Sequence, residues 1–156
     1  SKTEYTEWDD LVSLARRAFQ SYAILAGPAA RVKQISTRFI NRISPIRGVD
    51  SFDEILKRPP KSTDGLEEAH VADFMRRHVI QGIRGGVKAN LTVGTGVWEP
   101  SDIEPGRPLV IDIDAYIDGD LPANFDQFTE NLGRLREIKN ELFFGSLTEQ
   151  VLARFR

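Results

Sequence analysis

The first apolar residues of the chain recur at intervals of three and four positions, which is the spacing of one face of an α-helix. The run comprises Tyr5, Trp8, Leu11, Val12, Ala15, Ala18, Phe19, Tyr22 and Ala23. Gly27 and Pro28 follow it, and proline cannot continue a helix, whereas glycine accepts the left-handed turn that closes one. The pattern predicts an amphipathic helix over about residues 6–26.

A second long helix is predicted near the other end of the chain, over about residues 124–144 and closed by a glycine at 145. Its apolar face is formed by Phe125, Phe128, Leu132, Leu135, Ile138 and Leu142. The spacing of Ser146 and Glu149 is typical of a capping box and predicts a final short helix. A further short helix is predicted from Asp50 to Lys57, with Asp50 as its cap.

Four segments have the composition and alternation of β-strands. They are Arg31 to Ile43, Val71 to Ile83, Val87 to Thr95 and Leu109 to Asp118. Gly85 and Gly86, between the second and third segments, favour a hairpin, because tight hairpin turns need positive φ. The order of elements predicts an α+β fold: a mostly antiparallel sheet of about four strands, flanked by two long amphipathic helices and a short C-terminal helix.

The length of 156 residues is that of one domain, and we interpret residues 1–156 as a single α+β domain. Because the chain enters its first helix almost at once, we expect it to be the C-terminal part of a longer protein. The formal net charge of −2 offers no basic field for a polyanion, which argues against a dedicated nucleic-acid binder. No apolar run approaches the roughly 20 residues that cross a bilayer.

The absence of cysteine removes disulfides, thiolate zinc sites and cysteine nucleophiles together, and it fits a reducing cytoplasm. With only His70 and His78, a histidine metal site is not expected, and we predict no cofactor. The predicted hairpin carries basic residues that could contact a nucleic-acid backbone: Arg76, Arg77, His78, Arg84 and Lys88. However, Arg76 and Arg77 face opposite sides of a strand and no aromatic platform alternates with them, which favours a solvated face.

Asp112 and Asp114 project from one face of the last strand together with Asp118, and Asp120 follows in the turn. Hard divalent cations prefer oxygen ligands, and such pairs occur in metal-dependent phosphoryl chemistry. The competing interpretation is a polar sheet face on which the aspartates pair with arginines or water. Arg38 and Arg42 share a face of the first strand and could bind phosphate or carboxylate groups. We expect one of these arginines to approach Asp112 or Asp114 across the sheet.

Several short motifs together resemble a known family. They are Tyr5-x-x-Trp8, Arg38-Phe39-Ile40-Asn41-Arg42-Ile43, Asp112-Ile113-Asp114, Phe143-Phe144 and Thr148. This set resembles the C-terminal half of a sporadically distributed family of uncharacterised bacterial proteins with the hallmark Arg-Tyr-Ile-Asn-Arg-Ile. Phe39 stands where that hallmark has tyrosine, so no role of a hydroxyl carries over. The resemblance implies a preceding N-terminal domain and transfers no catalytic residue.

Two functions from different classes remain open. The first is a non-enzymatic binding or regulatory module that acts through protein–protein contacts, with a second copy or a preceding domain as partner. Phe143 and Phe144 are its interface candidates, because adjacent helical residues point about 100° apart and both rings fit one core face only at its edge. The alternative is a metal-dependent hydrolase or nuclease that uses Asp112 and Asp114.

Overall fold

A computed structural model describes residues 7–27, 29–43, 51–62, 64–65, 71–95 and 108–153. Its elements, in chain order, are α1 (Trp8–Ala26), β1 (Arg31–Ile43), α2 (Phe52–Ile55), β2 (Met75–Ile80), β3 (Lys88–Thr95), β4 (Leu109–Pro122), α3 (Phe125–Ser146) and α4 (Glu149–Leu152). A 3-10 turn, η1 (Arg84–Gly86), joins β2 to β3. None of the described helices is both long and apolar enough to cross a membrane.

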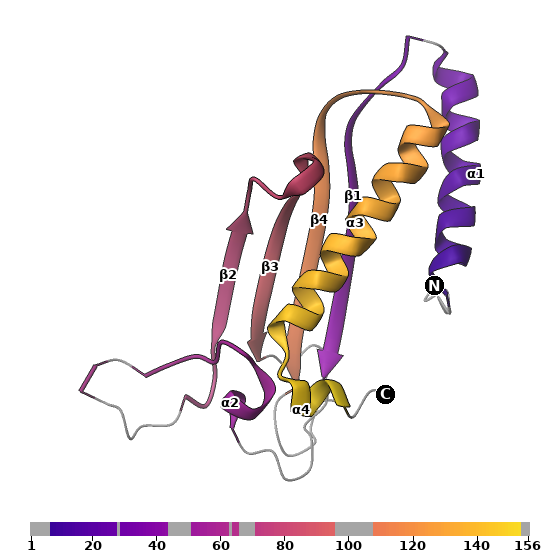
Figure 1. Cartoon of the computed structure of the whole chain (residues 1–156). Helices are drawn as coiled ribbons and strands as arrows, with labels where there is room; N and C mark the ends of the chain where they lie inside the picture. The colour runs from indigo at the N-terminus through magenta and orange to yellow at the C-terminus, as the bar shows by residue number, and fades with distance from the viewer. Residues whose placement is uncertain are drawn as a thin grey trace.

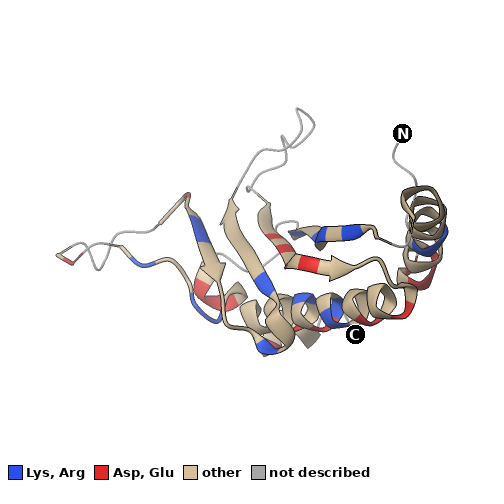
Figure 2. Cartoon of the chain, turned by 90° about the horizontal axis from the view of Figure 1, so that it is seen from above, with Lys and Arg blue, Asp and Glu red and all other residues tan. Residues whose placement is uncertain are grey.

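The strands form one antiparallel sheet in the order β1-β4-β3-β2 (Figure 1). Helix α3 lies along one face of this sheet, and α1 lies beside the β1 edge. Seen from above, the other face has no described helix over it (Figure 2). The α+β fold with two long helices and a short C-terminal one is therefore confirmed.

Buried and less buried side chains alternate along β4 and so distinguish the two faces of the sheet. Ile111, Ile113 and Ala115 are fully buried toward α3, whereas Asp112 and Asp114 alternate with them and lie on the open face. Strand β1 follows the same alternation except near its start, where its pairing with β4 shifts register between Val32 and Gln34. This irregularity turns Val32 toward the core and leaves Lys33 exposed, whereas the regular alternation predicted for a strand from Arg31 to Ile43 would put Lys33 on the same face as Ile35.

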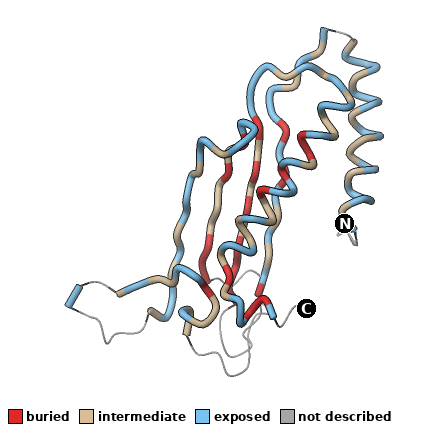
Figure 3. Tube along the Cα trace, viewed as in Figure 1, coloured by how far each residue is buried: buried red, intermediate tan, exposed pale blue. Residues whose placement is uncertain are grey.

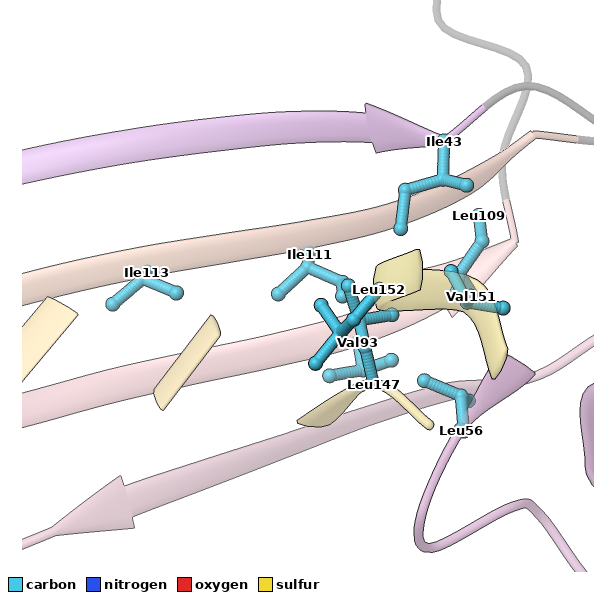
Figure 4. Packing of buried hydrophobic residues seen from close by; sticks show 9 residues of the cluster. All are labelled: Ile43, Leu56, Val93, Leu109, Ile111, Ile113, Leu147, Val151 and Leu152. Carbon is cyan, nitrogen blue, oxygen red and sulfur yellow. The ribbon is translucent and has the colours of Figure 1, made fainter. Parts of the chain in front are cut away.

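Buried residues lie on the strands and on α3 (Figure 3), and those of the core fall into two clusters. The first, near the middle of α3, is formed by Ile35, Val87, Ala115, Ile117, Leu132, Leu135 and Ile138. The second joins the sheet to the turn between α3 and α4 (Figure 4) and contains Ile43, Leu56, Val93, Leu109, Ile111, Ile113, Leu147, Val151 and Leu152. The apolar face predicted for α3 is thus the face that covers the sheet.

The two short helices are held to each other at the end of this second cluster. Leu56 and Leu147 form an isolated antiparallel bridge, and both side chains are buried. The backbone N–H of Lys57 donates to the carbonyl of Ser146 at 3.0 Å, and that of Thr148 donates to the carbonyl of Ile55 at 2.9 Å. Segments about ninety positions apart therefore close one end of the fold through backbone hydrogen bonds.

Several predicted boundaries were wrong, for local reasons. The hydroxyl of Ser146 donates to the carbonyl of Leu142 at 2.7 Å, so Ser146 ends α3 instead of capping the next helix. Thr148 caps α4 by accepting from the N–H of Val151. Gly145 lies inside α3 and does not close it.

The remaining boundary corrections concern α2 and β2. Helix α2 is capped by Ser51, whose hydroxyl accepts from the N–H of Asp53, while Asp50 is outside the described residues. Strand β2 is much shorter than the predicted Val71 to Ile83. The predicted hairpin pairing is present, but Gly85 and Gly86 belong to η1 rather than to a two-residue turn.

Candidate functional site

The open face of the sheet carries a ladder of polar and charged side chains that links the strands. It consists of Arg38 on β1, Asp112, Asp114 and Asp118 on β4, Lys88 and Asn90 on β3, and Arg77 on β2. In an antiparallel sheet, residues opposite each other project from the same face. Because Arg38 is opposite Asp114 and Asn90 is also opposite Asp114, the register brings this set together.

The strongest contact in the ladder joins Arg38 to Asp112. The guanidinium Nε donates to Oδ1 at 3.0 Å and Nη2 donates to Oδ2 at 2.7 Å. This two-point pairing raises the pKa of Arg38, mainly through the hydrogen bond to Asp112. The predicted approach of an arginine to an aspartate across the sheet is confirmed, although it joins diagonal rather than directly opposite residues.

The other predicted site residues on this face have separate surroundings. Asp114 accepts from Nδ2 of Asn90 at 3.3 Å, and Asn90 in turn accepts from Arg77 at 3.4 Å. Arg42 is opposite Val110 near the end of the β1–β4 ladder. Arg38, Asp112 and Asp114 therefore lie close together on the open face, but Asp114 is hydrogen-bonded to Asn90 and not to Arg38, and Arg42 lies nearer the end of the ladder.

The two carboxylates already have partners within the sheet: Asp112 pairs with Arg38, and Asp114 accepts a hydrogen bond from Asn90. Both carboxylate oxygens of Asp112 accept hydrogen bonds from Arg38, which leaves little capacity for a divalent cation. Within the described part of the chain, no group of three or more His, Cys, Asp or Glu side chains could hold a metal ion. The hydrogen bonds of this arrangement link β1 to β4, β4 to β3 and β3 to β2 across the open face.

A neighbouring ion pair gives a titration prediction. Lys88 lies 2.8 Å from one oxygen of Asp118 and 3.0 Å from the other, and its hydrogen bond lowers the pKa of that carboxyl. We expect Lys88→Met to raise the pKa of Asp118 toward its ordinary value, as read from carboxyl carbon shifts in an NMR pH titration. Asp120, whose pKa is lowered by Lys33, serves as the internal control and should not change.

The same pair sets the sign of the acid response. Because the folded pKa of Asp118 lies below its unfolded value, the pair stabilises the fold above the unfolded pKa. That contribution is lost as the pH falls through the folded pKa, which means below about pH 4. An unchanged Asp118 titration in Lys88→Met would contradict the contact.

The two interface candidates on α3 have different surroundings. Phe143 is half-buried and packs against the core cluster that contains Leu147, whereas Phe144 is 51% exposed. Their rings meet edge to face with centroids 5.3 Å apart. The short helix α4 therefore does not cover both rings, and Phe144 remains available at the surface.

Helix α1 has an apolar surface that extends further than Phe144. The helical pattern in the sequence did not show which apolar residues of α1 face the domain and which face solvent. Helix α1 has no buried residue. One face packs on the domain, with the Phe19 ring stacked 4.2 Å from that of Phe128 and the Trp8 ring 6.1 Å from that of Phe39. The other face carries what we call the outer stripe: Leu11, Leu14, Ala18, Ser21 and Leu25.

All five residues of the outer stripe are exposed. Leu14 is 56% exposed and Leu25 is 88% exposed, with the 81% exposed Ile24 beside it. Its steps of three and four residues are those of positions a and d in a heptad repeat. The one hydroxyl in it, that of Ser21, donates to the carbonyl of Arg17 at 3.1 Å and so needs no outside partner.

The chain was compared with protein-family models, with curated proteins and with solved structures, and none of them matches it. The resemblance through the Arg38 to Ile43 motif thus stays a prediction. Of its residues, Tyr5 lies outside the described part of the chain. Phe39 packs under the Nζ of Lys139, 4.2 Å from its ring centroid, on the helix side of β1.

Proposed function

We propose that the chain is a non-enzymatic module that acts through protein–protein contacts, and that the outer stripe of α1 is its contact surface. The observation that carries the proposal is a helix of 19 residues without a single buried side chain. Helices in water owe most of their stability to packing, and exposed apolar patches of this kind mark interaction sites. A partner that covers the stripe would supply the packing that the domain itself does not give.

The occupant we propose is the outer stripe of a second copy of this chain. Its heptad spacing fits another helix, because a and d side chains interlock with the same pattern on a facing helix. An apolar seam is also self-complementary, which is what a two-fold interface requires. Tyr22 and Ile24, both exposed, border the seam and widen its apolar area.

The expected dimer is weak. Two heptads bury less than the roughly 800 Å² per partner of a standard interface. We therefore expect a dissociation constant in the range of about 1–100 μM, where sedimentation velocity resolves monomer from dimer.

Leu14→Glu tests this interface with little effect on the fold, because the side chain is more than half exposed. The wild-type chain should sediment as a concentration-dependent dimer and Leu14→Glu as a monomer, with unchanged circular dichroism. Ser13→Glu is the matched control, since it adds the same charge to an exposed position on another side of α1. A wild-type monomer at about 200 μM, or equal disruption by Ser13→Glu, would contradict the proposal.

The alternative function, metal-dependent hydrolysis at Asp112 and Asp114, has no geometric observation in its favour. Arg38 donates hydrogen bonds to both carboxylate oxygens of Asp112, and Asp114 accepts a hydrogen bond from Asn90. Calorimetry with Mg²⁺ and Mn²⁺ separates the two functions. Saturable uptake that Asp112→Asn abolishes would support the hydrolase, whereas the binding module predicts no such uptake.

A further inference from the structure

Residues of β2 and of the last turns of α3 line a groove on the helix side of the sheet. Strand β2 lies at the edge of the sheet away from α1 (Figure 1). The volume of the groove is about 420 Å³, within the range of small-molecule sites. His78 and Ile80 of β2 and Leu91 of β3 line it from the sheet, and Leu142 lines it from α3. Since β2 is an edge strand, the groove is open at the side of the domain.

Two arginines stand at this groove, Arg76 from β2 and Arg58 from the segment after α2. The Nε of Arg76 is buried and has no hydrogen-bond partner among the described residues. A buried donor without a partner loses its hydration and gains nothing in return, which is rare in native proteins. The unpartnered Nε therefore marks the Arg76 guanidinium as a partly desolvated cation that lines the groove.

The Phe74 ring lies beside the Arg76 guanidinium, and none of the described acidic side chains pairs with it. Its central carbon lies 5.9 Å from the centroid of the Phe74 ring. Burial lowers the pKa of Arg76, and the like charge of Arg58 lowers it further. Two cations near each other in a partly desolvated groove raise the free energy of the empty site, and an anion between them would reverse that effect.

The acidic residue of the groove does not neutralise these arginines. Glu141 is engaged by Arg84, whose Nη1 donates to Oε2 at 2.9 Å and whose Nη2 donates to Oε1. This pairing lowers the pKa of Glu141 and keeps it ionised against Arg84. The groove therefore has an excess of positive charge at one end and an apolar lining of Ile80, Leu91 and Leu142.

We propose that this groove binds a small organic oxyanion, a carboxylate or phosphate monoester that carries an apolar group. Its oxygens lie against Arg58 and Arg76, and its apolar group lies on Ile80, Leu91 and Leu142. Guanidinium groups bind both kinds of head through paired N–H donors, and a desolvated site strengthens these bonds. The proposal is independent of the α1 interface, because no residue is common to the two surfaces.

Calorimetric titration at low ionic strength tests the site with three probes: phenyl phosphate, phenylacetate and inorganic phosphate. At least one of the phenyl probes should bind saturably, and phenyl phosphate should bind about tenfold more tightly than inorganic phosphate because of its buried ring. The stronger of phenyl phosphate and phenylacetate identifies the head group. Both should weaken as salt is added.

Arg76→Met should weaken the binding at least about tenfold while keeping the melting temperature, because Arg76 has no described hydrogen-bond partner to lose at Nε. Arg77→Met is the matched control. It removes the same charge from the next residue, which faces the opposite side of β2 and donates to Asn90. Arg58→Met should weaken binding as well.

Three outcomes would overturn the proposal. One is no saturable binding of either phenyl probe at concentrations up to about 10 mM. Another is equal weakening by Arg76→Met and Arg77→Met, which would mean that the probes respond to overall charge and not to the groove. A folded Arg76→Met variant that binds like the wild type counts against the site in the same way.

Discussion

Replacement of Leu135 by alanine is expected to lower the free energy of unfolding by about 2–5 kcal/mol. Leu135 is 0% exposed and lies in the middle of the face that α3 turns to the sheet. It belongs to the cluster that also contains Ala115 and Ile117, so its removal leaves a cavity in the first core cluster. The lost transfer free energy and the cavity add up, because a close-packed core relaxes only in part.

Urea denaturation followed by circular dichroism measures this effect, with Leu14→Ala as the matched control. Leu14 is 56% exposed on the outer stripe, so the same change there should cost less than about 0.5 kcal/mol in the monomer. Leu135→Ala should shift the transition midpoint without changing its slope, which reports the surface exposed on unfolding. A cost below about 1 kcal/mol would mean that α3 does not cover the sheet as described.

Much of this fold could be predicted from the sequence because its strongest signals are local. The alternation of Ile111, Asp112, Ile113 and Asp114 has the period of a strand with one buried face, and the structure has that strand. The stripe of α3 that contains Leu135 follows the helical period in the same way. These patterns predict the structure because β4 and α3 each bury one face against a single layer, so the apolar residues follow the period of the element.

The wrong predictions concern helix ends and strand pairing, where a residue can bond to more than one partner. Ser146 and Thr148 are both good capping residues, and the hydroxyl of Ser146 instead bonds back to α3. The irregularity at Lys33 arises where the start of β1 pairs with the last residues of β4. It depends on how the two strands pair, so the sequence of either strand alone does not predict it. Side-chain chemistry on one segment cannot report the register of another.

Of the candidate surfaces, only the contact between an arginine of β1 and an aspartate of β4 could be predicted, because it follows from the faces of two paired strands. The sequence predicts that Arg38 or Arg42 approaches Asp112 or Asp114, and the register of the sheet selects the diagonal pair of Arg38 and Asp112. The outer stripe of α1 was hidden because a helical pattern of three- and four-residue steps does not say which apolar residues face the domain. The groove was hidden because Arg58 and Arg76 meet only through the fold.

A further large effect is expected where two strands approach most closely. Gly94 on β3 is opposite Met75 on β2, and a Cβ added there would lie 2.7 Å from the carbonyl oxygen of Phe74 and 3.1 Å from the Cα of Met75. Both neighbours are backbone atoms, so no flexible side chain can move aside. The Phe74 carbonyl is also held, because it accepts from the N–H of Thr95 at 3.0 Å.

Gly94→Ala should therefore destabilise the domain by about 1–3 kcal/mol, the usual cost of overpacking, even though alanine lowers the entropy of the unfolded chain. Gly133→Ala is the control: it lies within α3 with no atom within 4 Å of an added Cβ and should stabilise by about 0.5–1 kcal/mol. Opposite signs for these two substitutions in urea denaturation are the expected result. Since β2 forms the outer wall of the groove, hydrogen exchange should also quicken first at Arg76 and His78 in Gly94→Ala. If Gly94→Ala is neutral or stabilising, β2 does not pair with β3 as closely as this register requires.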